Sequence, residues 1–135
     1  MFTLIKIENS GRNVPEPLRL AVSAAVNAPY GTPLSVKGGT ATPLTASTTA
    51  AATHILLANA NGTSLLCARV TPDMVFEVPL SAAPSAMKVG TEYALSADGS
   101  AVSATAVSGS VRGAILVDTC GAAKAGDKIL VRFAQ

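Results

Sequence analysis

The residues able to do nucleophilic chemistry are few: one histidine, His54, and two cysteines, Cys67 and Cys120. A cysteine–histidine pair needs both side chains within hydrogen-bond reach and a third group that orients the base. An expected hairpin about Asn61-Gly62 places residue 54 opposite residue 69 rather than opposite Cys67, and the sequence offers no evident third group. We therefore interpret His54 as a structural or surface residue and both cysteines as small buried hydrophobes.

Metal and phosphate sites also lack their usual residues. One histidine and two distant cysteines do not give the ligand spacing of a zinc site, and the eight carboxylates are dispersed. Asp98 in SADGS is not followed by the alternating acidic ligands of a calcium loop. GAAKAGDK, residues 121–128, has the glycine spacing of a phosphate loop, but Asp127 would repel phosphate. We predict turns at both places, with no metal and no cofactor.

Sugar-cleaving enzymes use a pair of carboxylates, and any two of the eight could meet in the fold. Their clefts usually also contain aromatic platforms, for which two Tyr, three Phe and no Trp are a small supply. The sequence therefore favours a protein that is not an enzyme.

The composition describes a weakly charged chain. Its 135 residues fit one domain, and charged residues make up 13% of it, about half of the usual share of roughly 25%. The net charge of +2 comes from basic residues scattered between Lys6 and Arg132, without a cluster that would bind nucleic acid. A hydrophobic share of 49% with so little charge is the reverse of a disordered composition.

The beginning of the chain, MFTLIKIENSGR, does not have the pattern of a secretory signal. It lacks a basic first region, and Lys6 and Glu8 interrupt its apolar run. No stretch approaches the roughly 18 consecutive apolar residues of a membrane-spanning helix. We expect no membrane partner and synthesis in the cytoplasm, where a disulfide is not expected.

The stretch GGTATPLTASTTAAATHILLANANGTSLLCA, residues 38–68, contains no charged residue. Its first part, 40–52, has no helical face and no strong strand pattern, so we predict a long surface loop. Its second part predicts a hairpin, because Asn61-Gly62 suits a type I′ turn between two apolar strands. A hairpin with so little charge can be covered on both faces, by its own domain or by a neighbour.

Short strands are predicted elsewhere too. Residues 2–8 read as a strand or an extended arm, and 18–26 alternate with Leu20, Val22, Ala24 and Val26 on one face. Asp98-Gly99 predicts a second hairpin. The remaining strands fall in LSVKGG and in residues 74–80, 111–119 and 128–133.

Seven to nine strands at a spacing of roughly 8–12 residues, with no convincing long helix, are typical of an all-β protein. We predict a small β-sandwich or barrel-like domain over 18–135, with long loops and an N-terminal extended arm over 1–17.

The C-terminal part, VGTEYALSADGSAVSATAVSGSVRGAILVDTCGAAKAGDKILVRF, resembles the capsid decoration proteins of tailed bacteriophages, also called head-stabilising or cement proteins. The shared features are the Asp98-Gly99 turn, Gly113-Ala114-Ile115 on a strand, and Gly126-Asp127 before the strand Ile129-Leu130-Val131. The resemblance covers residues 88–135 by pattern and the rest by composition, and its motifs are turns and strands.

This resemblance implies a β-rich protein on the virion capsid exterior that clamps neighbouring subunits of the major capsid protein. Such proteins are often homotrimers, although dimers and monomers exist, and in several of them an N-terminal arm contacts the capsid. The alternatives are another virion component, such as a head-fibre base, a tail part or a receptor-binding module, and a small β-domain enzyme or ligand-binding protein.

We assign the expected capsid contacts to the arm and to the loop 38–52. FTLIKIE, followed by a Gly/Pro-rich segment, has the composition of an arm that adds a strand to a partner sheet. An ordinary strand of the domain is an equal alternative for residues 2–8. The candidate contact residues are Phe2, Leu4, Ile5, Ile7, Pro43 and Leu44.

Overall fold

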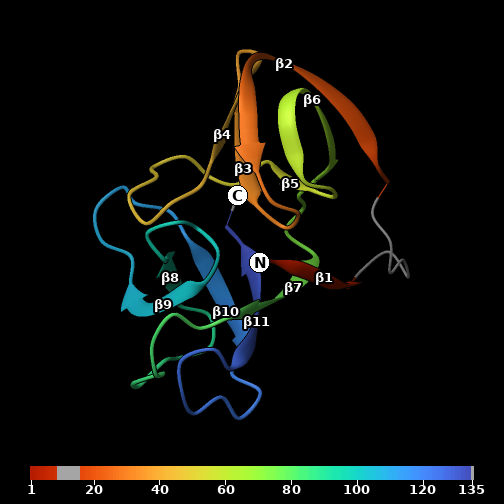
Figure 1. Ribbon diagram of the computed structural model, residues 1–135. Coiled ribbons are helices and arrows are strands. Elements are labelled where there is room, and N and C mark those ends of the chain that lie inside the picture. Colours follow the sequence, from red (N-terminus) through yellow and green to blue (C-terminus); the bar gives the residue numbers. More distant parts are fainter. Residues whose placement is uncertain (9–15, 135) are drawn as a thin grey trace.

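The computed structural model describes residues 1–8 and 16–134 (Figure 1). Within these ranges the protein has eleven strands and no helix, so the all-β prediction is confirmed. The strands are β1 (Thr3–Ile7), β2 (Leu18–Ala28), β3 (Pro33–Lys37), β4 (Thr40–Pro43), β5 (His54–Leu56), β6 (Ala60–Arg69), β7 (Met74–Pro79), β8 (Glu92–Leu95), β9 (Val102–Ala106), β10 (Ala114–Asp118) and β11 (Lys128–Phe133).

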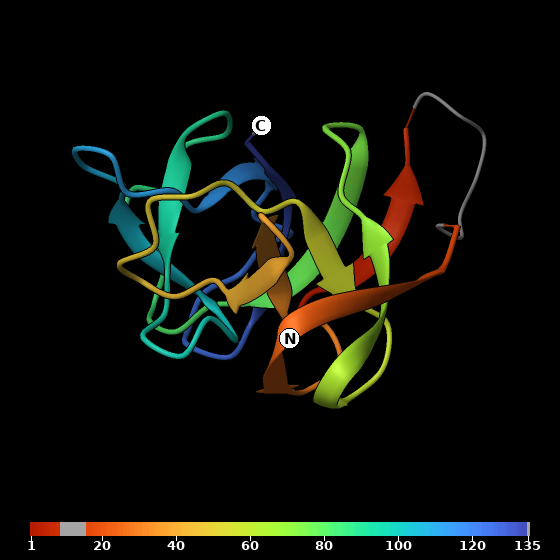
Figure 2. The ribbon, with the colours of Figure 1, turned by 90° about the horizontal axis from the view of Figure 1, so that it is seen from above.

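Six strands form a large antiparallel sheet in the order β1-β7-β11-β10-β8-β9. The sheet curls back on itself, because Leu80, just after β7, bridges Val102 of β9. The N–H of Ser81 donates to the carbonyl of Val102 over 2.9 Å at the same place. Figure 1 shows these strands in the lower part of the view, with the small sheet above them, so the two sheets overlap when seen from above in Figure 2. Closure of this kind leaves few free strand edges.

The other five strands form a small antiparallel sheet in the order β2-β6-β5-β3-β4. The hairpin from β3 to β4 turns at Gly38 and Gly39, whose φ angles of 58° and 77° are those of a type I′ turn. This turn reaches the other edge of the sheet, where the N–H of Ser23 in β2 donates to the Gly39 carbonyl over 2.9 Å. The small sheet therefore also curls until its edges meet.

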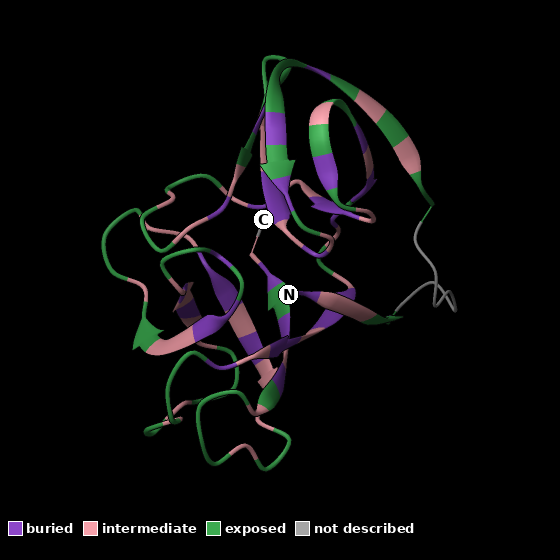
Figure 3. Ribbon diagram, viewed as in Figure 1, coloured by how far each residue is buried: buried purple, intermediate pink, exposed green. Residues whose placement is uncertain are grey.

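All three phenylalanines of the chain meet in the main core. The ring of Phe2 lies 4.9 Å from that of Phe133 and 6.4 Å from that of Phe76, measured between centroids. The rings of Phe76 and Phe133 are 5.3 Å apart and meet edge to face, an arrangement that aromatic pairs prefer. The main core also takes in residues of the small sheet, such as Ile55 and Ala68, so it joins the two sheets. Figure 3 shows the buried residues alternating with exposed ones along the strands.

A β-bulge explains how β1 fits into the large sheet. Strict alternation would place Phe2, Leu4 and Lys6 on one face and would bury a charge. The pairing of β1 with β7 instead shifts by one residue between Leu4 and Lys6. The shift turns Lys6 to solvent and brings Ile7 into the core next to Met74. Residues 3–7 are therefore a strand of the domain rather than a separate arm; residues 9–15 of the predicted arm lie outside the described residues.

Two strand predictions fail because the partner strand overrides the local signal. Residues 40–52 were expected to be loop throughout, but 40–43 form β4, which pairs with β3. Asn61-Gly62 does not make a tight turn, because these residues lie inside β6 and pair with Asn27 and Val26 of β2. The register of the hairpin is nevertheless as predicted, with His54 opposite Arg69.

A bulge also corrects the predicted face of β2. Its pairing with β6 shifts between Ala21 and Val26, so Val22 and Val26 are buried but Ala24 is exposed. The hairpin at Asp98-Gly99 is confirmed, with Leu95 opposite Val102. The last strand has the predicted bounds, 128–133.

Candidate interaction surface

The structure separates the residues that were considered for nucleophilic chemistry. His54 lies opposite Arg69, while Cys67 lies opposite Leu56. The His54 Nδ1 is 2.9 Å from the hydroxyl of Thr53, and burial, with a smaller effect from Arg69, lowers the pKa of this histidine. The ring thus favours its neutral form, held by a neighbouring hydroxyl as a structural histidine would be.

The two cysteines differ in their surroundings. Cys67 is buried, as expected, and burial raises the pKa of its thiol. Cys120 is exposed, which corrects the expectation that both are buried. It lies in the turn after β10 with a positive φ of 52°, and the Asp118 carboxylate accepts a hydrogen bond from its N–H over 2.8 Å. Neither thiol is in a disulfide.

Two aspartates that resembled ligand sites close their own turns. One oxygen of Asp98, Oδ1, accepts hydrogen bonds from the Ser96 hydroxyl and from the N–H and hydroxyl of Ser100, and the Ser100 bonds above all lower the pKa of Asp98 to about 2. The Asp127 carboxylate accepts from the N–H groups of Ala123 and Lys124 over 2.9 and 3.2 Å. These N–H groups are the ones a bound phosphate would need. Within the described ranges, no three His, Cys, Asp or Glu side chains are grouped to hold a metal.

Three of the predicted capsid contacts belong to the core. Phe2, Ile7 and Leu44 are buried, with Leu44 completely inaccessible to solvent. Their side chains pack against residues of the same domain and offer no surface to a second protein, so their assignment as contacts is corrected. A short chain with few large apolar side chains buries most of them in its core, so few remain on the surface to contact a partner.

The other three predicted contacts reach the surface. Ile5, at the bulge of β1, is 43% exposed. Leu4 is partly buried, lining a small crevice with Tyr30 and Leu57. Pro43 is partly buried at the end of β4 and lines a larger pocket.

Residues 38–52 present an uncharged surface. Eight of the positions from 40 to 50 are at least partly exposed and carry small uncharged side chains. Six of them are Thr or Ser, and the other two are Ala46 and Ala50. The residues 47–50 and the outward faces of β3 and β4 border an open groove of about 500 Å³, whose lining is mostly hydroxyl-bearing and includes one charged residue, Lys37. The N–H of Arg112 donates to the Thr48 carbonyl over 2.9 Å and holds the segment in place.

Two surface features were missed by the sequence analysis. One is the connection between β7 and β8, residues 81–91, where Val89 is 68% exposed. The other is a pocket of about 370 Å³ formed by the chain start, residues 27–32, Pro43 and the turn 98–100. The run Ala82-Ala83-Pro84 hinted at the loop, but the pocket joins four separate segments and left no sequence pattern.

Comparison of the chain with protein-family models, with curated proteins and with solved structures gives no match. None of the described residues forms a helix of the length and hydropathy needed to cross a membrane.

Proposed function

We propose that this protein is a structural virion protein that binds the outer surface of a bacteriophage capsid and clamps neighbouring major capsid subunits. The proposal combines the resemblance of residues 88–135 to capsid decoration proteins with the kind of surface that the fold presents. In this proposal the protein works as an oligomer, as a trimer at three-fold positions of the shell, and performs no chemistry of its own.

The observation that carries the proposal is the uncharged, largely exposed segment 38–52. Binding a broad surface costs free energy for each charge that loses water, and this segment has no charge to desolvate. Its Ala, Ser and Thr side chains also lose little rotamer entropy when they become immobile. The fold fixes its backbone through β4 and through the bond from Arg112 to Thr48. A surface of this kind suits shape-based attachment to another protein.

The outer edge of β1 supplies a second point of attachment. Strand β1 is the last strand of the large sheet, and no strand within the described ranges pairs with its outer side. An extended segment of a capsid subunit can add to such an edge through backbone hydrogen bonds, with Ile5 contributing apolar contact. The bulge beside Ile5 limits the pairing to a short stretch. Repetition over a symmetric shell makes short contacts sufficient.

The test is binding of the purified protein to purified expanded shells that lack it, measured by co-sedimentation. An Ala50→Glu substitution places a charge in the exposed part of segment 38–52, and Ile5→Ser removes the apolar contact at β1. We expect each to weaken binding by about tenfold, the effect of desolvating one charge or losing one apolar contact.

The matched control is Ala125→Glu, because Ala125 is also an exposed alanine and lies in the turn before β11. It adds the same charge elsewhere and should leave binding unchanged. Equal binding by Ala50→Glu and by the unmodified protein would contradict the role of segment 38–52. No binding by the unmodified protein would contradict the proposed function and would favour the tail, fibre or ligand-binding alternatives.

A further inference from the structure

The connection between β7 and β8 carries an exposed knob, defined here as Lys88 and Val89; Met87, just before it, is partly buried and packs against the main core. Val89 is the most exposed large hydrophobic residue of the described chain, at 68%. The knob stands in a loop whose other residues are small, with Ala82, Ala83 and Ala86 exposed. Lys88 is the only charged residue between 81 and 91. The loop therefore presents apolar side chains around one cation.

The knob is held in one conformation. The N–H of Lys88 donates to the hydroxyl of Tyr93 over 2.6 Å, and the N–H of Gly90 donates to the Leu116 carbonyl over 2.8 Å. Ala86 has a φ of 56°, a left-handed conformation that non-glycine residues adopt at a cost. A segment that is fixed in advance loses less entropy when it binds.

The pocket of about 370 Å³ is also lined by apolar groups, but its charged residue is an acid instead of a base. Apolar groups of Met1, Pro29, Tyr30 and Pro43 line it, and Asp98 is its only carboxylate. Every side-chain or backbone donor that reaches Asp98 within the described ranges bonds to Oδ1, which leaves Oδ2 for an incoming cation.

One neighbouring cation is already at the pocket. The amino group of Met1 donates to the Ser100 carbonyl. Burial lowers the pKa of this amino group, while the nearby Asp98 carboxylate acts in the opposite direction.

The two features match in charge and in their apolar surroundings, and they belong to the same chain. We propose that the knob of one copy of this protein inserts into the pocket of a second copy, with Lys88 paired to Asp98 and with Val89 against the apolar wall. The single cation of the knob meets the single carboxylate of the pocket, and each is flanked by apolar groups. This contact does not depend on attachment to a capsid.

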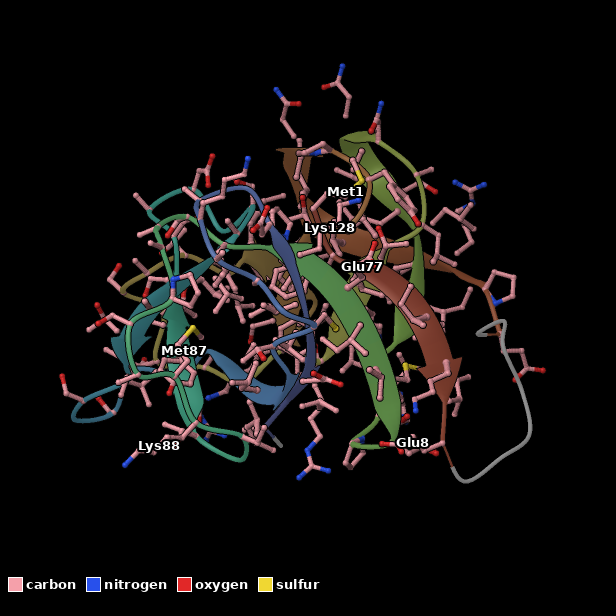
Figure 4. The ribbon with its side chains drawn as sticks, turned by 90° about the horizontal axis from the view of Figure 1, so that it is seen from below. Met1, Glu8, Glu77, Met87, Lys88 and Lys128 are labelled. Atoms are coloured by element: carbon pink, nitrogen blue, oxygen red, sulfur yellow. The ribbon has the colours of Figure 1, made fainter. Side chains whose placement is uncertain are left out.

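The positions of the two features explain why a second copy is needed. Figure 4 shows Met87 and Lys88 on the side of the molecule away from Met1, so one chain cannot fill its own pocket. A contact between two different patches leaves one copy of each pair with a free pocket and the other copy with a free knob. Such a contact repeats until it closes into a ring, or else it extends as a filament.

The experiment measures the molar mass of the full chain by light scattering over a range of concentrations, with three variants. Val89→Ser keeps the loop but removes the apolar side chain of the knob, and it should raise the dissociation constant by about tenfold or more. Lys88→Gln and Asp98→Asn each remove one charge while keeping a polar group of similar size. Asp98→Asn also retains an acceptor oxygen for the turn, so the fold is preserved.

The double variant identifies the pair. If Lys88 and Asp98 meet across the contact, Lys88→Gln and Asp98→Asn should each weaken association, and combining them should add little. Lys124→Gln, which removes a charge from another exposed turn, should leave the molar mass unchanged. Additive effects of the two substitutions, or a monomer at all concentrations, would overturn the inference.

These outcomes separate the inference from the proposed function. A chain that stays monomeric and still binds shells would overturn the knob contact and leave the capsid role standing. A chain that associates through the knob and binds no shell would support the knob contact and contradict the capsid role.

Discussion

Single residues in this protein have roles that their position in the sequence conceals. Phe2 lies next to the chain start in an apolar run, as an arm residue would, but its ring is in contact with Phe133 at the centre of the core. It is 1% exposed. The scarcity of aromatic residues makes each of them hard to replace within the fold.

Phe2→Ala should therefore lower the free energy of unfolding by about 3–5 kcal/mol, the usual cost of removing a buried phenylalanine ring. Ile5→Ala, at an exposed position of β1, is the control and should cost less than about 1 kcal/mol. Urea denaturation followed by circular dichroism measures both. Equal and small effects would mean that Phe2 lies outside the core.

Asp98 gives the fold a dependence on pH. Its pKa falls from the usual 3.8 to about 2, mainly because the hydroxyl and N–H of Ser100 donate to the carboxylate. A lowered pKa in the folded state means that the ionised form stabilises the fold above 3.8, and that this contribution is lost as the pH falls from 3.8 to about 2.

Asp98→Asn removes the titration but retains an acceptor. Its melting temperature should lie below that of the unmodified protein at neutral pH, and the difference should vanish below about pH 2. Thermal melts at a series of pH values measure this difference. A difference that does not change with pH would show that the charge of Asp98 contributes nothing to the turn.

At the scale of the strand, the bulge in β1 lets Phe2, Leu4 and Ile7 face the core together, although Leu4 and Ile7 are three residues apart instead of two. Deleting Ile5 would leave the order Phe-Thr-Leu-Lys-Ile, which alternates regularly with Phe2, Leu4 and Ile7 inward.

We predict that the Ile5 deletion folds with a melting temperature close to that of the unmodified protein. Deleting Val78 from β7, which pairs on both sides with β1 and β11, should prevent folding, because it turns the remaining side chains to the wrong face. Thermal melts of both proteins decide the matter, and an unfolded Ile5 deletion would contradict this account of the bulge.

The strands differ in how far the sequence alone predicts them. The strand 128–133 is predicted to the residue, because it alternates apolar and polar positions between clear turn residues. Two turn signals of similar strength have opposite outcomes. Gly38-Gly39 makes a tight turn, but Asn61-Gly62 continues as strand, because β2 pairs with it from far away in the sequence. Local patterns do not contain that pairing.

The same limit applies to the candidate surface. The run of residues 38–52 without charge is visible in the sequence and is largely exposed in the fold. Which apolar residues remain outside is not visible there: Leu44 and Ile7 are buried, while Val89 is exposed. The pairing of the strands determines which apolar side chains face the core and which face solvent.

At the scale of the molecule, the main core joins the two sheets. It contains Ile55 and Ala68 from the small sheet together with Phe76 and Val131 from the large one. Neither sheet can unfold without exposing apolar surface of the other. We predict a single cooperative transition, seen at the same urea concentration by far-ultraviolet circular dichroism and by tyrosine fluorescence. Two separate transitions would mean that the sheets are stable independently.

The central claim is that the protein covers a capsid, and the most direct test is its copy number in purified phage particles. Quantitative mass spectrometry compares this chain with the major capsid protein in the same particles. The account predicts many copies, in a simple ratio to the shell subunit set by the symmetry sites that the protein occupies. A few copies per particle would assign the protein to the tail or fibres, and its absence from the particle would contradict the capsid role.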